Sequence, residues 1–529
     1  MSKFRVLVSD PISEKGLGAL NESPNVDLDI RTDLTPAQLI EIIGDYDALL
    51  VRSQTKVTAE IIAAGKNLKA IGRAGVGVDN IDVPAATQHG IIVINAPDGN
   101  TISTCEHTFA MMMSMARKIP QAHGKLKAGT WDRKSFVGVE LNNKTLGVLG
   151  FGRIGAEVAK RAKAFNMKVM AFDPFLTRER AESAGVQMAT VDEIVENADF
   201  ITVHTPLTKD TKHLISHDQF ARMKDGVRLL NCARGGIIDE QALVAALESG
   251  KVAGVALDVF EEEPPLGNPL LNFDNVVVTP HLGASTQEAQ INVAIDVAFE
   301  LLNILEGRAF KNAVNLPSLS GEAMKQVGPY LLLAERLGTL VASLGGDPVR
   351  KIEVTYTGHL AEGQTEPLTR SVLKGLLSYY HEEVNYVNAP LVAEQYRVQV
   401  EEIKSSRHAV YANLLQVRLI TEKQSISAAG TLINEIVGPR IVLIDDFKVD
   451  LEPEGTLLLA KNMDQPGMIG QIGTVLGEAQ INIASMKVGR RNEGEALMVL
   501  SVDKSPNEDT MATISKINGI MSVKDVVLA

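Results

Sequence analysis

Two hydrophobic patterns alternate along the first 95 residues of the chain. Short runs rich in aliphatic and β-branched residues, such as FRVLVSD at 4–10 and YDALLVRS at 46–53, are separated by stretches with helical spacing, such as LTPAQLIEII at 34–43. A strand, a helix and a further strand at this spacing form βαβ crossovers, which build a parallel sheet. The pattern therefore predicts an α/β domain at the start of the chain.

A second α/β ladder follows between residues 145 and 283, where runs such as TLGVLGFG and VAGVALDVF alternate with helical segments. Long helical stretches lie on either side of it, at 101–119 and 285–307. We predict that this second sheet is inserted into the first domain, with the two long helices as paired crossings.

The pattern changes after residue 317. Residues 319–450 mix helices with strands, among them a strand at RIVLIDDF, and carry no chemical motif. Residues 455–529 follow the order strand, helix, strand, strand, helix, strand. That order is typical of a ferredoxin-like α+β domain.

Charge and cysteine content exclude several classes of partner. The chain has 529 residues, with 52 Lys and Arg against 65 Asp and Glu, so its net charge is −13. Such a chain is not attracted non-specifically to nucleic acid or to an anionic membrane, and an anionic ligand must be held by a local group of cations. The two cysteines, Cys105 and Cys232, provide neither a disulfide framework nor a metal-ligand cluster. With no secretory signal and no long uncharged apolar run, the sequence predicts a cytoplasmic protein.

The segment GVLGFGRIG at 147–155 places Gly150, Gly152 and Gly155 between a β-rich run and a helix. Side chains at these positions would block the tight turn, the approach of the backbone to a pyrophosphate, or the packing of helix on strand. Asp173 ends the next strand, where the fold places a carboxylate on the adenosine ribose. Because that carboxylate would repel a 2′-phosphate, the sequence predicts NAD rather than NADP.

Polar residues stand at or just beyond the ends of successive strands of the second ladder: Arg234 in LLNCARGG, Glu263 in DVFEEEPP and His281 in VVVTPHLGAS. Singly, each has an ordinary explanation: a surface ion pair, a solvated carboxylate, or a loop histidine with a satisfied partner. Beside an NAD site they form a catalytic set, because a histidine oriented by a carboxylate can take a hydroxyl proton while hydride leaves the same carbon. Arginine can grip an α-carboxylate. The set therefore predicts oxidation of a 2-hydroxy acid.

The segments GFGRIG, NCARGGIIDE, GVALDVFEEEPP and TPHLGAST together resemble the D-isomer-specific 2-hydroxyacid dehydrogenases, which thread an NAD domain through a split substrate domain. The resemblance implies that His281 is the acid/base, Glu263 its partner and Arg234 the carboxylate-binding residue. It divides the chain into a substrate-binding domain (1–98 and 290–316), a Rossmann NAD-binding domain (99–289), an intervening domain (319–450) and a C-terminal ACT domain (455–529).

The same resemblance implies further contacts with NAD. Family members often carry threonine where Val76 stands, which removes a hydroxyl contact near the nicotinamide. The expected contacts are Arg153 and Ile154 at the pyrophosphate, Val76 near the nicotinamide, Asp258 and Thr205 along the nicotinamide and adenosine parts, and in addition Cys232, Gly283 and Ala284.

Within the family, VRSQTKV, GRAGVGVDNID, NAPDGNTIS and the C-terminal extension resemble the long members that oxidise 3-phosphoglycerate to 3-phosphohydroxypyruvate in the first step of serine synthesis. The substrate phosphate requires cations. The candidates are Arg52, Arg73, Arg133 and Lys134, with Ser53, Gly75 and Asn100 as further donors to the carboxylate and phosphate ends. Arg73 has an alternative role as a buried structural cation. In related enzymes WDRKSF, which carries Arg133 and Lys134, reaches toward a neighbouring subunit, so a dimer is expected to complete the pocket.

The last domain resembles an ACT domain, a small amino-acid sensor that pairs with a second copy. Asp464 and Gly467 stand at a strand-to-helix turn, where free N–H groups can receive a carboxylate and Asp464 an ammonium group. Asn482 is expected to face that turn, and Asn462 to line the site. The resemblance implies feedback binding of L-serine in a homodimer or homotetramer. Alternatively, these residues only shape a turn in a dimerisation module.

Two other functions share parts of this pattern. A glyoxylate or hydroxypyruvate reductase would use the same NAD site and catalytic set, but needs neither a phosphate-binding cluster nor an ACT domain. A non-catalytic NAD-dependent binding protein, like corepressors with this fold, would keep the nucleotide site without turnover. Arg52, Arg133 and Lys134 argue against the first, and the ACT domain argues against the second.

Overall fold

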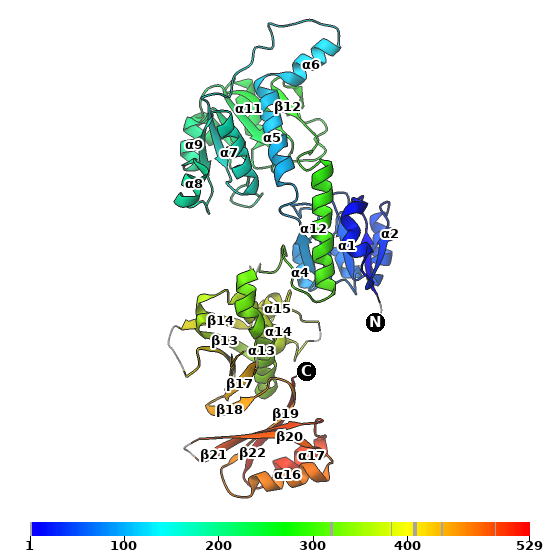
Figure 1. Cartoon of the computed structure of the whole chain (residues 1–529), viewed down its shortest axis with the longest axis vertical. Coiled ribbons are helices and arrows are strands. Elements are labelled where there is room, and N and C mark those ends of the chain that lie inside the picture. The colour runs from blue at the N-terminus through cyan, green and yellow to red at the C-terminus, as the bar shows by residue number, and fades with distance from the viewer. Residues whose placement is uncertain are drawn as a thin grey trace.

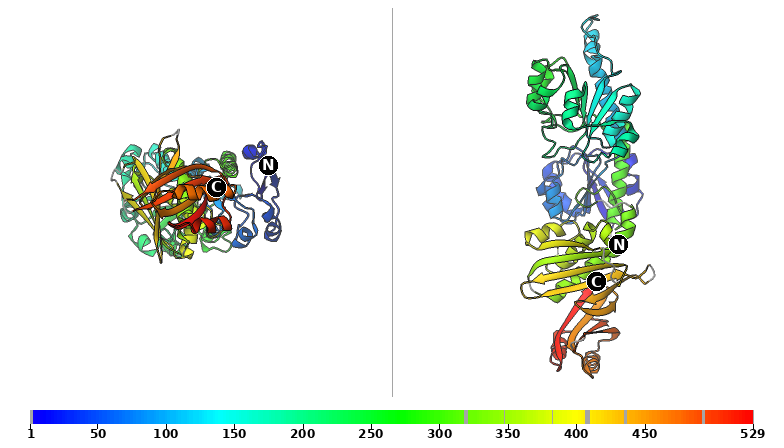
Figure 2. Two further views of the ribbon diagram at one scale, coloured as in Figure 1. Left: turned by 90° about the horizontal axis from the view of Figure 1, so that it is seen from below. Right: turned by 90° about the vertical axis from the view of Figure 1, so that its left-hand side faces the viewer.

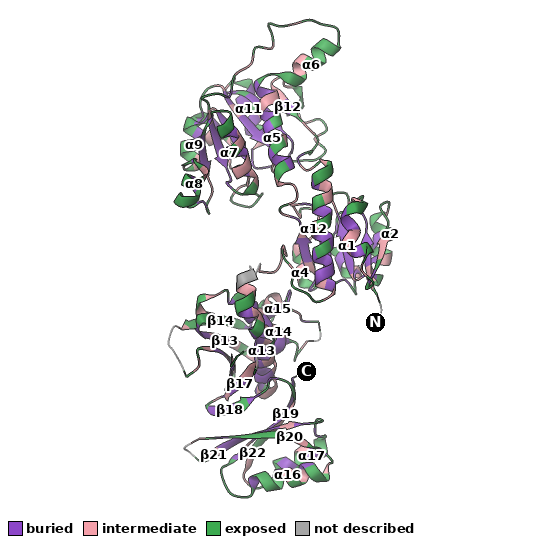
Figure 3. Cartoon of the chain, viewed as in Figure 1, coloured by how far each residue is buried: buried purple, intermediate pink, exposed green. Residues whose placement is uncertain are grey.

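A computed structural model of the chain describes residues 3–317, 321–346, 348–381, 383–405, 410–434, 437–491 and 494–528. The described residues form four sheets that follow one another along an elongated molecule (Figure 1). A second direction of view places the N-terminal sheet between the second sheet and the C-terminal half of the chain (Figure 2). Buried residues, purple in Figure 3, concentrate inside these sheets and on the helix faces against them. Short 3-10 helices lie at Glu14–Leu17, Ile43–Asp45, Pro269–Asn272 and His359–Glu362.

The N-terminal sheet is parallel, as the alternating pattern predicts. The buried ALLV run of β3 is typical of a central parallel strand that is covered on both faces. In the order β2-β1-β3-β4-β5, the strands are β1 (Phe4–Val8), β2 (Val26–Ile30), β3 (Ala48–Val51), β4 (Ala70–Arg73) and β5 (Ile92–Asn95), with helices α1 (Gly18–Asn21), α2 (Pro36–Ile42), α3 (Ala59–Ala64) and α4 (Val83–Gln88).

The long helix α12 (Gln287–Leu305) returns to this first sheet, although it follows the second sheet in sequence. Gly72 in β4 makes room for it, because a Cβ there would lie 2.5 Å from Val297 and 2.9 Å from Leu301. The second sheet is therefore inserted between two parts of one packed unit.

The second sheet is parallel, with the order β12-β11-β10-β9-β6-β7-β8. Counted from β6, this is the Rossmann order extended by one strand. The strands are β6 (Thr145–Leu149), β7 (Lys168–Phe172), β8 (Gln187–Met188), β9 (Phe200–Val203), β10 (Val227–Asn231), β11 (Val252–Leu257) and β12 (Val276–Val278). The helices are α5 (Thr101–Ala116), α7 (Arg153–Ala164), α8 (Arg178–Ala184), α9 (Val191–Asn197), α10 (His217–Arg222) and α11 (Glu240–Glu248).

The helix predicted over 101–119 is wrong at its C-terminal end. α5 stops at Ala116 because Lys118 adopts a left-handed conformation, with φ 51°. Pro120 then lies in the first turn of a new helix, α6 (Ile119–Lys127), every residue of which is at least partly exposed. α6 and the loop after it project from one end of the molecule (Figure 1).

The third sheet is mixed and has the order β14-β13-β15-β16-β17-β18. The strand predicted at RIVLIDDF is confirmed as β17 as far as Ile444, but the chain then turns at Asp445, whose φ is 48°, and Phe447 begins the second strand of a hairpin. α13 is long and apolar enough to cross a membrane over Ala323–Gly345, but it packs here as a core helix against α14. The elements are α13 (Gly321–Gly345), β13 (Val349–Gly358), α14 (Glu366–Leu377), α15 (Ala389–Gln395), β14 (Gln399–Ser405), β15 (Asn413–Thr421), β16 (Ser425–Leu432), β17 (Pro439–Ile444) and β18 (Phe447–Leu451).

The C-terminal sheet has the order β20-β21-β19-β22 and is antiparallel. This is the ferredoxin-like arrangement, which confirms the prediction from the order of elements. The elements are β19 (Gly455–Met463), α16 (Met468–Glu478), β20 (Ile483–Arg490), β21 (Glu495–Val502), α17 (Glu508–Ser515) and β22 (Ile520–Leu528).

Candidate active site

The glycine-rich loop lies between β6 and α7 at the carboxyl edge of the second sheet. Gly150 has φ 97°, and a Cβ there would lie 2.6 Å from the carbonyl oxygen of His204. A Cβ on Gly155 would lie 2.1 Å from the carbonyl oxygen of Gly150, so this position must stay bare for the helix to pack. By contrast, a Cβ on Gly152 would have no neighbour within 4 Å. The open space beside Gly152, at the N-terminus of α7, fits a pyrophosphate.

Asp173 is fixed just after β7, beside the glycine loop. One of its carboxylate oxygens accepts from the backbone N–H of Phe151 at 2.9 Å and the other from that of Phe175 at 2.8 Å. On the adjacent loop after β9, the hydroxyl of Thr205 is buried without a hydrogen-bond partner among the described residues. Burial also lowers the pKa of His204 to about 4, which keeps that ring neutral. A carboxylate where the ribose is predicted to lie and an unsatisfied buried hydroxyl on the adjacent loop fit a dinucleotide.

His281 and Glu263 form a direct pair. Nδ1 of His281 lies 2.9 Å from Oε2 of Glu263, and the backbone N–H of Phe260 donates to Oε1 of Glu263 at 3.2 Å. Burial acts to raise the pKa of Glu263, but the hydrogen bond and charge of His281 outweigh it and leave the pKa below its usual value. Glu263 is therefore ionised at neutral pH and orients the imidazole through Nδ1.

Arg234 reaches from the second sheet to the first domain. Its Nε donates to Oδ2 of Asp79 at 3.1 Å, and its Nη1 donates to the carbonyl oxygen of Ala233 at 2.7 Å. Asn231, buried at the end of β10, shapes this loop because its Nδ2 donates to the carbonyl oxygen of Arg234 at 2.7 Å. The side chain of Arg234 is thus held where the two domains meet.

Arg73 lies in the same region and is largely buried. Burial, followed by the charges of Arg234 and Arg52, lowers the pKa of Arg73 to about 10, against the opposing effect of Asp79. Asn80 holds the group together: it accepts from Nε of Arg73 at 3.1 Å and donates to the carbonyl oxygen of Arg52 at 2.9 Å. The guanidinium groups of Arg234 and Arg52 are therefore close enough to act electrostatically on that of Arg73, which favours an anionic ligand.

Comparison with known proteins agrees with this site. Models of protein families match residues 109–283 to the D-isomer specific 2-hydroxyacid dehydrogenase NAD binding domain, 326–445 to the D-3-phosphoglycerate dehydrogenase intervening domain, and 456–519 to the ACT domain. The D-3-phosphoglycerate dehydrogenase of Archaeoglobus fulgidus is 47% identical over 99% of this chain and 100% of its own length. The chain belongs to the D-3-phosphoglycerate dehydrogenase family. The predicted NAD-dependent dehydrogenase class is thereby confirmed.

Further relatives support this membership. The D-3-phosphoglycerate dehydrogenase of Bacillus subtilis is 47% identical over 98% of this chain and 99% of its own length. Among solved structures, D-lactate dehydrogenase from Aquifex aeolicus complexed with NAD and lactic acid matches with a TM-score of 0.51 and 30% identity, over 59% of this chain and 100% of that one. A glyoxylate reductase from Paecilomyes thermophila matches with a TM-score of 0.55 and 34% identity, over 59% of this chain and 99% of that one.

Asp258 is hydrogen-bonded to the loop that carries His281. Its carboxylate accepts from the Thr279 hydroxyl at 2.6 Å and from the N–H groups of Leu282 and Gly283 at 2.7 and 2.8 Å. Burial opposes ionisation, but hydrogen bonds, first that of His107, leave the pKa of Asp258 below its usual value. Asp258 thus anchors the loop that carries His281, and its expected contact with NAD stays a prediction.

The other predicted cofactor contacts differ in their surroundings. Cys232 is a buried free thiol whose pKa is raised to about 12, first by burial and then by the charge of Asp258, so it lies at the site as an uncharged group. Arg153 pairs with Asp98 at the start of α7. The remaining predicted contacts, Val76, Ile154 and Ala284, are each partly buried.

The other residues predicted to bind substrate lie in different surroundings. A Cβ on Gly75 would lie 2.3 Å from Nη1 of Arg73, so this glycine lies against the guanidinium. Ser53 is exposed beside Arg52, and Oδ1 of Asn100 is buried without a hydrogen-bond partner among the described residues. The donor roles predicted for the Ser53 hydroxyl, the Gly75 N–H and the Asn100 amide nitrogen stay predictions; the Gly75 N–H already donates to the carbonyl oxygen of Arg73 at 2.8 Å.

Arg133 and Lys134 do not join this cluster within one chain, and their expected role at the pocket of a neighbouring subunit stays a prediction. Both are exposed in the loop after α6, which extends away from the first domain (Figure 1). Asp132 shapes that loop by accepting from the backbone N–H of Lys134 at 3.1 Å and from Nζ of Lys125 at 2.8 Å.

The predicted ligand site of the ACT domain is only partly assembled in one copy. Oδ1 of Asn462 is buried without a hydrogen-bond partner among the described residues, and Gly467 caps α16 with φ 95°. Oδ2 of Asp464 lies 3.4 Å from Nε of Arg490, with which it forms an ion pair. Asn482 does not face this turn: it precedes β20 at the end of the sheet where Ile483 pairs with Val502 and Val502 with Thr456. Seven residues of strand separate the two ends, about 23 Å.

Residues that sequence reasoning missed hold the predicted ones in place. Asp79, Asn80 and Asn231 orient the arginines, and His107 contacts Asp258 at 3.1 Å. The first two lie in GRAGVGVDNID, the segment that carries the resemblance, so the segment was the available signal. Asn231 likewise begins NCARGGIIDE, another segment of the resemblance, whereas for His107 the sequence offers no comparable signal.

Proposed function

We propose that this chain catalyses the NAD-dependent oxidation of 3-phosphoglycerate to 3-phosphohydroxypyruvate, the first step of L-serine biosynthesis. The observation that carries the proposal is the His281–Glu263 pair at 2.9 Å on the sheet edge that also carries Arg234, with Arg73 and Arg52 across the domain boundary. The pair suits proton transfer, and the arginines suit a substrate with a carboxylate and a phosphate. The 47% identical relatives named above, over nearly the whole chain, support the same substrate.

His281 acts as the acid/base. Because its Nδ1 is engaged by Glu263, its Nε2 is the atom that receives the proton of the substrate hydroxyl. Glu263 stabilises the imidazolium that this transfer creates. NAD, when bound along the Gly150–Gly155 loop and Asp173, supplies the hydride acceptor. In the reverse direction, Nε2 returns the proton to the oxygen of the ketone.

The arginines hold the two anionic ends of the substrate. Arg234 binds the α-carboxylate and polarises the reacting carbon–oxygen bond, because its planar guanidinium presents paired donors. Arg73 and Arg52 bind the phosphate. With a pKa of about 10, Arg73 keeps its positive charge at neutral pH despite burial. Ser53, Gly75 and Asn100 are proposed as additional donors.

We also propose that L-serine binds the ACT domain at Asn462, Asp464 and Gly467, with Asn482 supplied by a second copy. Asp464 would take the ammonium group, and the N-terminus of α16 the carboxylate. Asn482 lies at the far end of the sheet within one copy, so a homodimer or homotetramer is needed to complete the site. Arg133 and Lys134 would likewise act on the pocket of a neighbouring subunit.

The proposed division of the chain is a substrate-binding domain of 1–98 and 290–316, an NAD-binding domain of 99–289, an intervening domain of 319–450 and an ACT domain of 455–529. We propose a reducing compartment, the cytoplasm, as the place of action. The buried free thiols Cys105 and Cys232 support this proposal.

The deciding experiment measures NADH consumption by the purified protein with 3-phosphohydroxypyruvate, hydroxypyruvate and glyoxylate, each with and without L-serine. A strong preference for the phosphorylated acid is expected, and a lower rate with serine would make the ACT domain a working sensor. Preference for an unphosphorylated acid would leave the hydride chemistry intact and overturn the role of Arg52 and Arg73. That outcome would indicate a glyoxylate or hydroxypyruvate reductase.

A further inference from the structure

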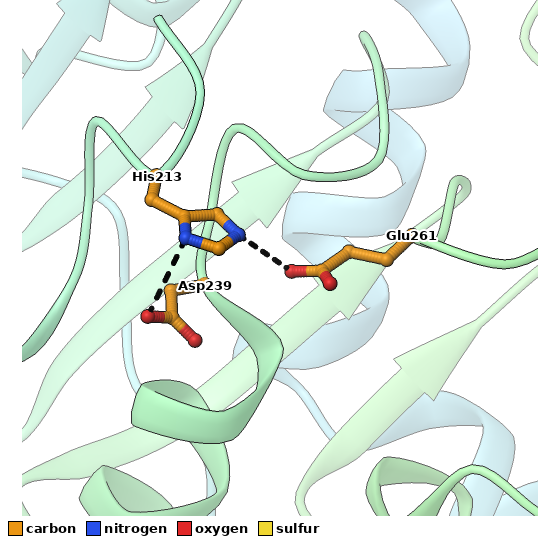
Figure 4. A group of neighbouring side chains, drawn as sticks. All are labelled: His213, Asp239 and Glu261. Carbon is orange, nitrogen blue, oxygen red and sulfur yellow. Dashed lines mark hydrogen bonds and ion pairs between the residues drawn. The ribbon is translucent and has the colours of Figure 1, made fainter.

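His213 lies between two carboxylates at the carboxyl edge of the second sheet. Its Nε2 is 3.2 Å from Oε1 of Glu261, and its Nδ1 is 3.8 Å from Oδ2 of Asp239 (Figure 4). The backbone of His213 is left-handed, with φ 54°. A non-glycine residue adopts this conformation only where its surroundings favour it, and such residues often serve a site.

The three side chains come from three successive loops. His213 follows β9, Asp239 follows β10 and Glu261 follows β11. The same loops carry the proposed site residues Thr205, Arg234 and Glu263, respectively. His213 is therefore placed to fix the spacing between loops that must cooperate in the reaction.

Backbone contacts join the loops at the same place. The N–H of His213 donates to the carbonyl oxygen of Gly236 at 2.7 Å, two residues after Arg234. A Cβ on Gly235 would lie 1.8 Å from the carbonyl oxygen of Phe260, so the second and third loops are in close contact. The N–H of Phe260 in turn donates to Glu263. Glu261 and Glu263 are two residues apart in one loop, so a shift of Glu261 would also move Glu263, which orients His281.

Hydrogen bonding explains this cluster better than metal ligation. The three groups each offer one ligand atom within 4.8 Å of the others, which is a possible spacing for a cation site. Figure 4, however, shows the imidazole ring between the carboxylates, with each nitrogen directed at a different one. A shared metal requires ligand atoms that converge on one point. Asp239 is also occupied, since it accepts from the Ser216 hydroxyl at 2.8 Å and caps α11 through its other oxygen.

We propose that His213 is a positioning residue of the reaction. Through Nε2 it holds Glu261, and thereby the loop that presents Glu263 to His281. Through its backbone N–H, which donates to the carbonyl oxygen of Gly236 at 2.7 Å, it holds the loop of Arg234. This inference rests on the proposed dehydrogenase activity, and it adds to it a residue that touches neither substrate nor cofactor.

Two substitutions separate the two ends of the imidazole. In His213→Asn the backbone stays left-handed, because Asn tolerates that conformation, but the shorter amide retains only the Nδ1 side. In His213→Gln the amide nitrogen reaches the position of Nε2 and retains the donor to Glu261. His217→Asn is the matched control, since His217 is exposed on α10 and lies outside the cluster.

The test uses the full-length protein. The number of NADH-binding sites is measured first, so that rates refer to folded sites, and kcat and KM are then determined for reduction of 3-phosphohydroxypyruvate. Because small misplacements of catalytic groups are costly, we expect His213→Asn to lower kcat about tenfold or more with KM changed less than about threefold. His213→Gln should restore kcat to within about threefold of wild type. His217→Asn should match wild type.

The outcomes are distinct. Wild-type kcat in His213→Asn would overturn the inference, and so would an equal loss in the Asn and Gln variants, which would indicate that His213 only fills space. If His213→Asn fails to bind NADH, Glu261→Gln is the second variant, because it keeps the shape of the side chain and weakens the acceptor. A lower kcat is then expected, and an unchanged one overturns the inference. Absence of turnover in the wild type would overturn the proposed function, and this inference with it.

Discussion

Alanine substitutions in the glycine loop should separate cofactor contact from folding. A Cβ on Gly152 has no neighbour within 4 Å, whereas a Cβ on Gly155 would lie 2.1 Å from the carbonyl oxygen of Gly150. The backbone of Gly152 is extended, with φ −73° and ψ −155°, so its φ lies outside the left-handed region that favours glycine. We therefore expect Gly152→Ala to change the free energy of unfolding of the cofactor-free protein by less than about 0.5 kcal/mol. Gly155→Ala should lower it by about 1–3 kcal/mol, because backbone must move.

For cofactor binding, Gly152→Ala should be the damaging change even though it leaves folding intact. The added methyl group would occupy the space where the backbone approaches the pyrophosphate. A loss of about tenfold to a hundredfold in NADH affinity is expected, which corresponds to about 1.4–2.8 kcal/mol.

Two measurements on each variant test this reasoning. Thermal denaturation without NADH reports folding, since 1 kcal/mol shifts Tm by about 2–4 °C in a domain of 150–250 residues. Fluorescence titration with NADH reports binding. Wild-type NADH affinity in Gly152→Ala would refute the placement of the pyrophosphate, and a fall in Tm as large as that of Gly155→Ala would refute the steric argument.

Three further substitutions test the chemistry. His281→Ala should lower turnover by about 10² to 10⁴ while NADH still binds, as measured by steady-state rates and titration; near-wild-type turnover would remove His281 from the mechanism. Asp173→Ala should relax the preference for NADH over NADPH in the same rate assay, and an unchanged preference would show that the ribose contact is misassigned. Arg73→Gln should raise KM for 3-phosphohydroxypyruvate by about tenfold or more and leave KM for hydroxypyruvate little changed, because a charge-assisted contact to phosphate is lost; equal effects on both substrates would instead support a structural role for Arg73.

The catalytic set is predictable from the sequence because its positions follow strand ends. Arg234, Glu263 and His281 come after β10, β11 and β12, which are neighbours in the sheet. The carboxyl ends of neighbouring parallel strands share one edge, so position along the chain brings these side chains together. The glycine loop and Asp173 follow from the same rule.

Contacts between loops and the register of strands are not predictable in this way. The Arg234–Asp79 bond joins residues 155 apart, and no periodicity connects them. Asn482 lies at the opposite end of its sheet from the predicted turn, because strand pairing, rather than the chemistry of the turn, decides which residues face each other. The end of α5 depends on the left-handed backbone of Lys118, which a helical hydrophobic pattern does not reveal.

The glycine-rich segment of the first domain is explained by the side chains it admits. A Cβ on Gly77 would lie 1.9 Å from Nη2 of Arg234, and one on Gly75 would lie 2.3 Å from Nη1 of Arg73. Because Gly75 and Gly77 have no side chain, two guanidinium groups can lie against one stretch of backbone. Their proximity is only partly compensated, since burial and the charge of Arg234 lower the pKa of Arg73 while the charge of Asp79 opposes that shift. An anionic substrate would add to the counter-charge that Asp79 supplies, so this local arrangement fits the proposed site.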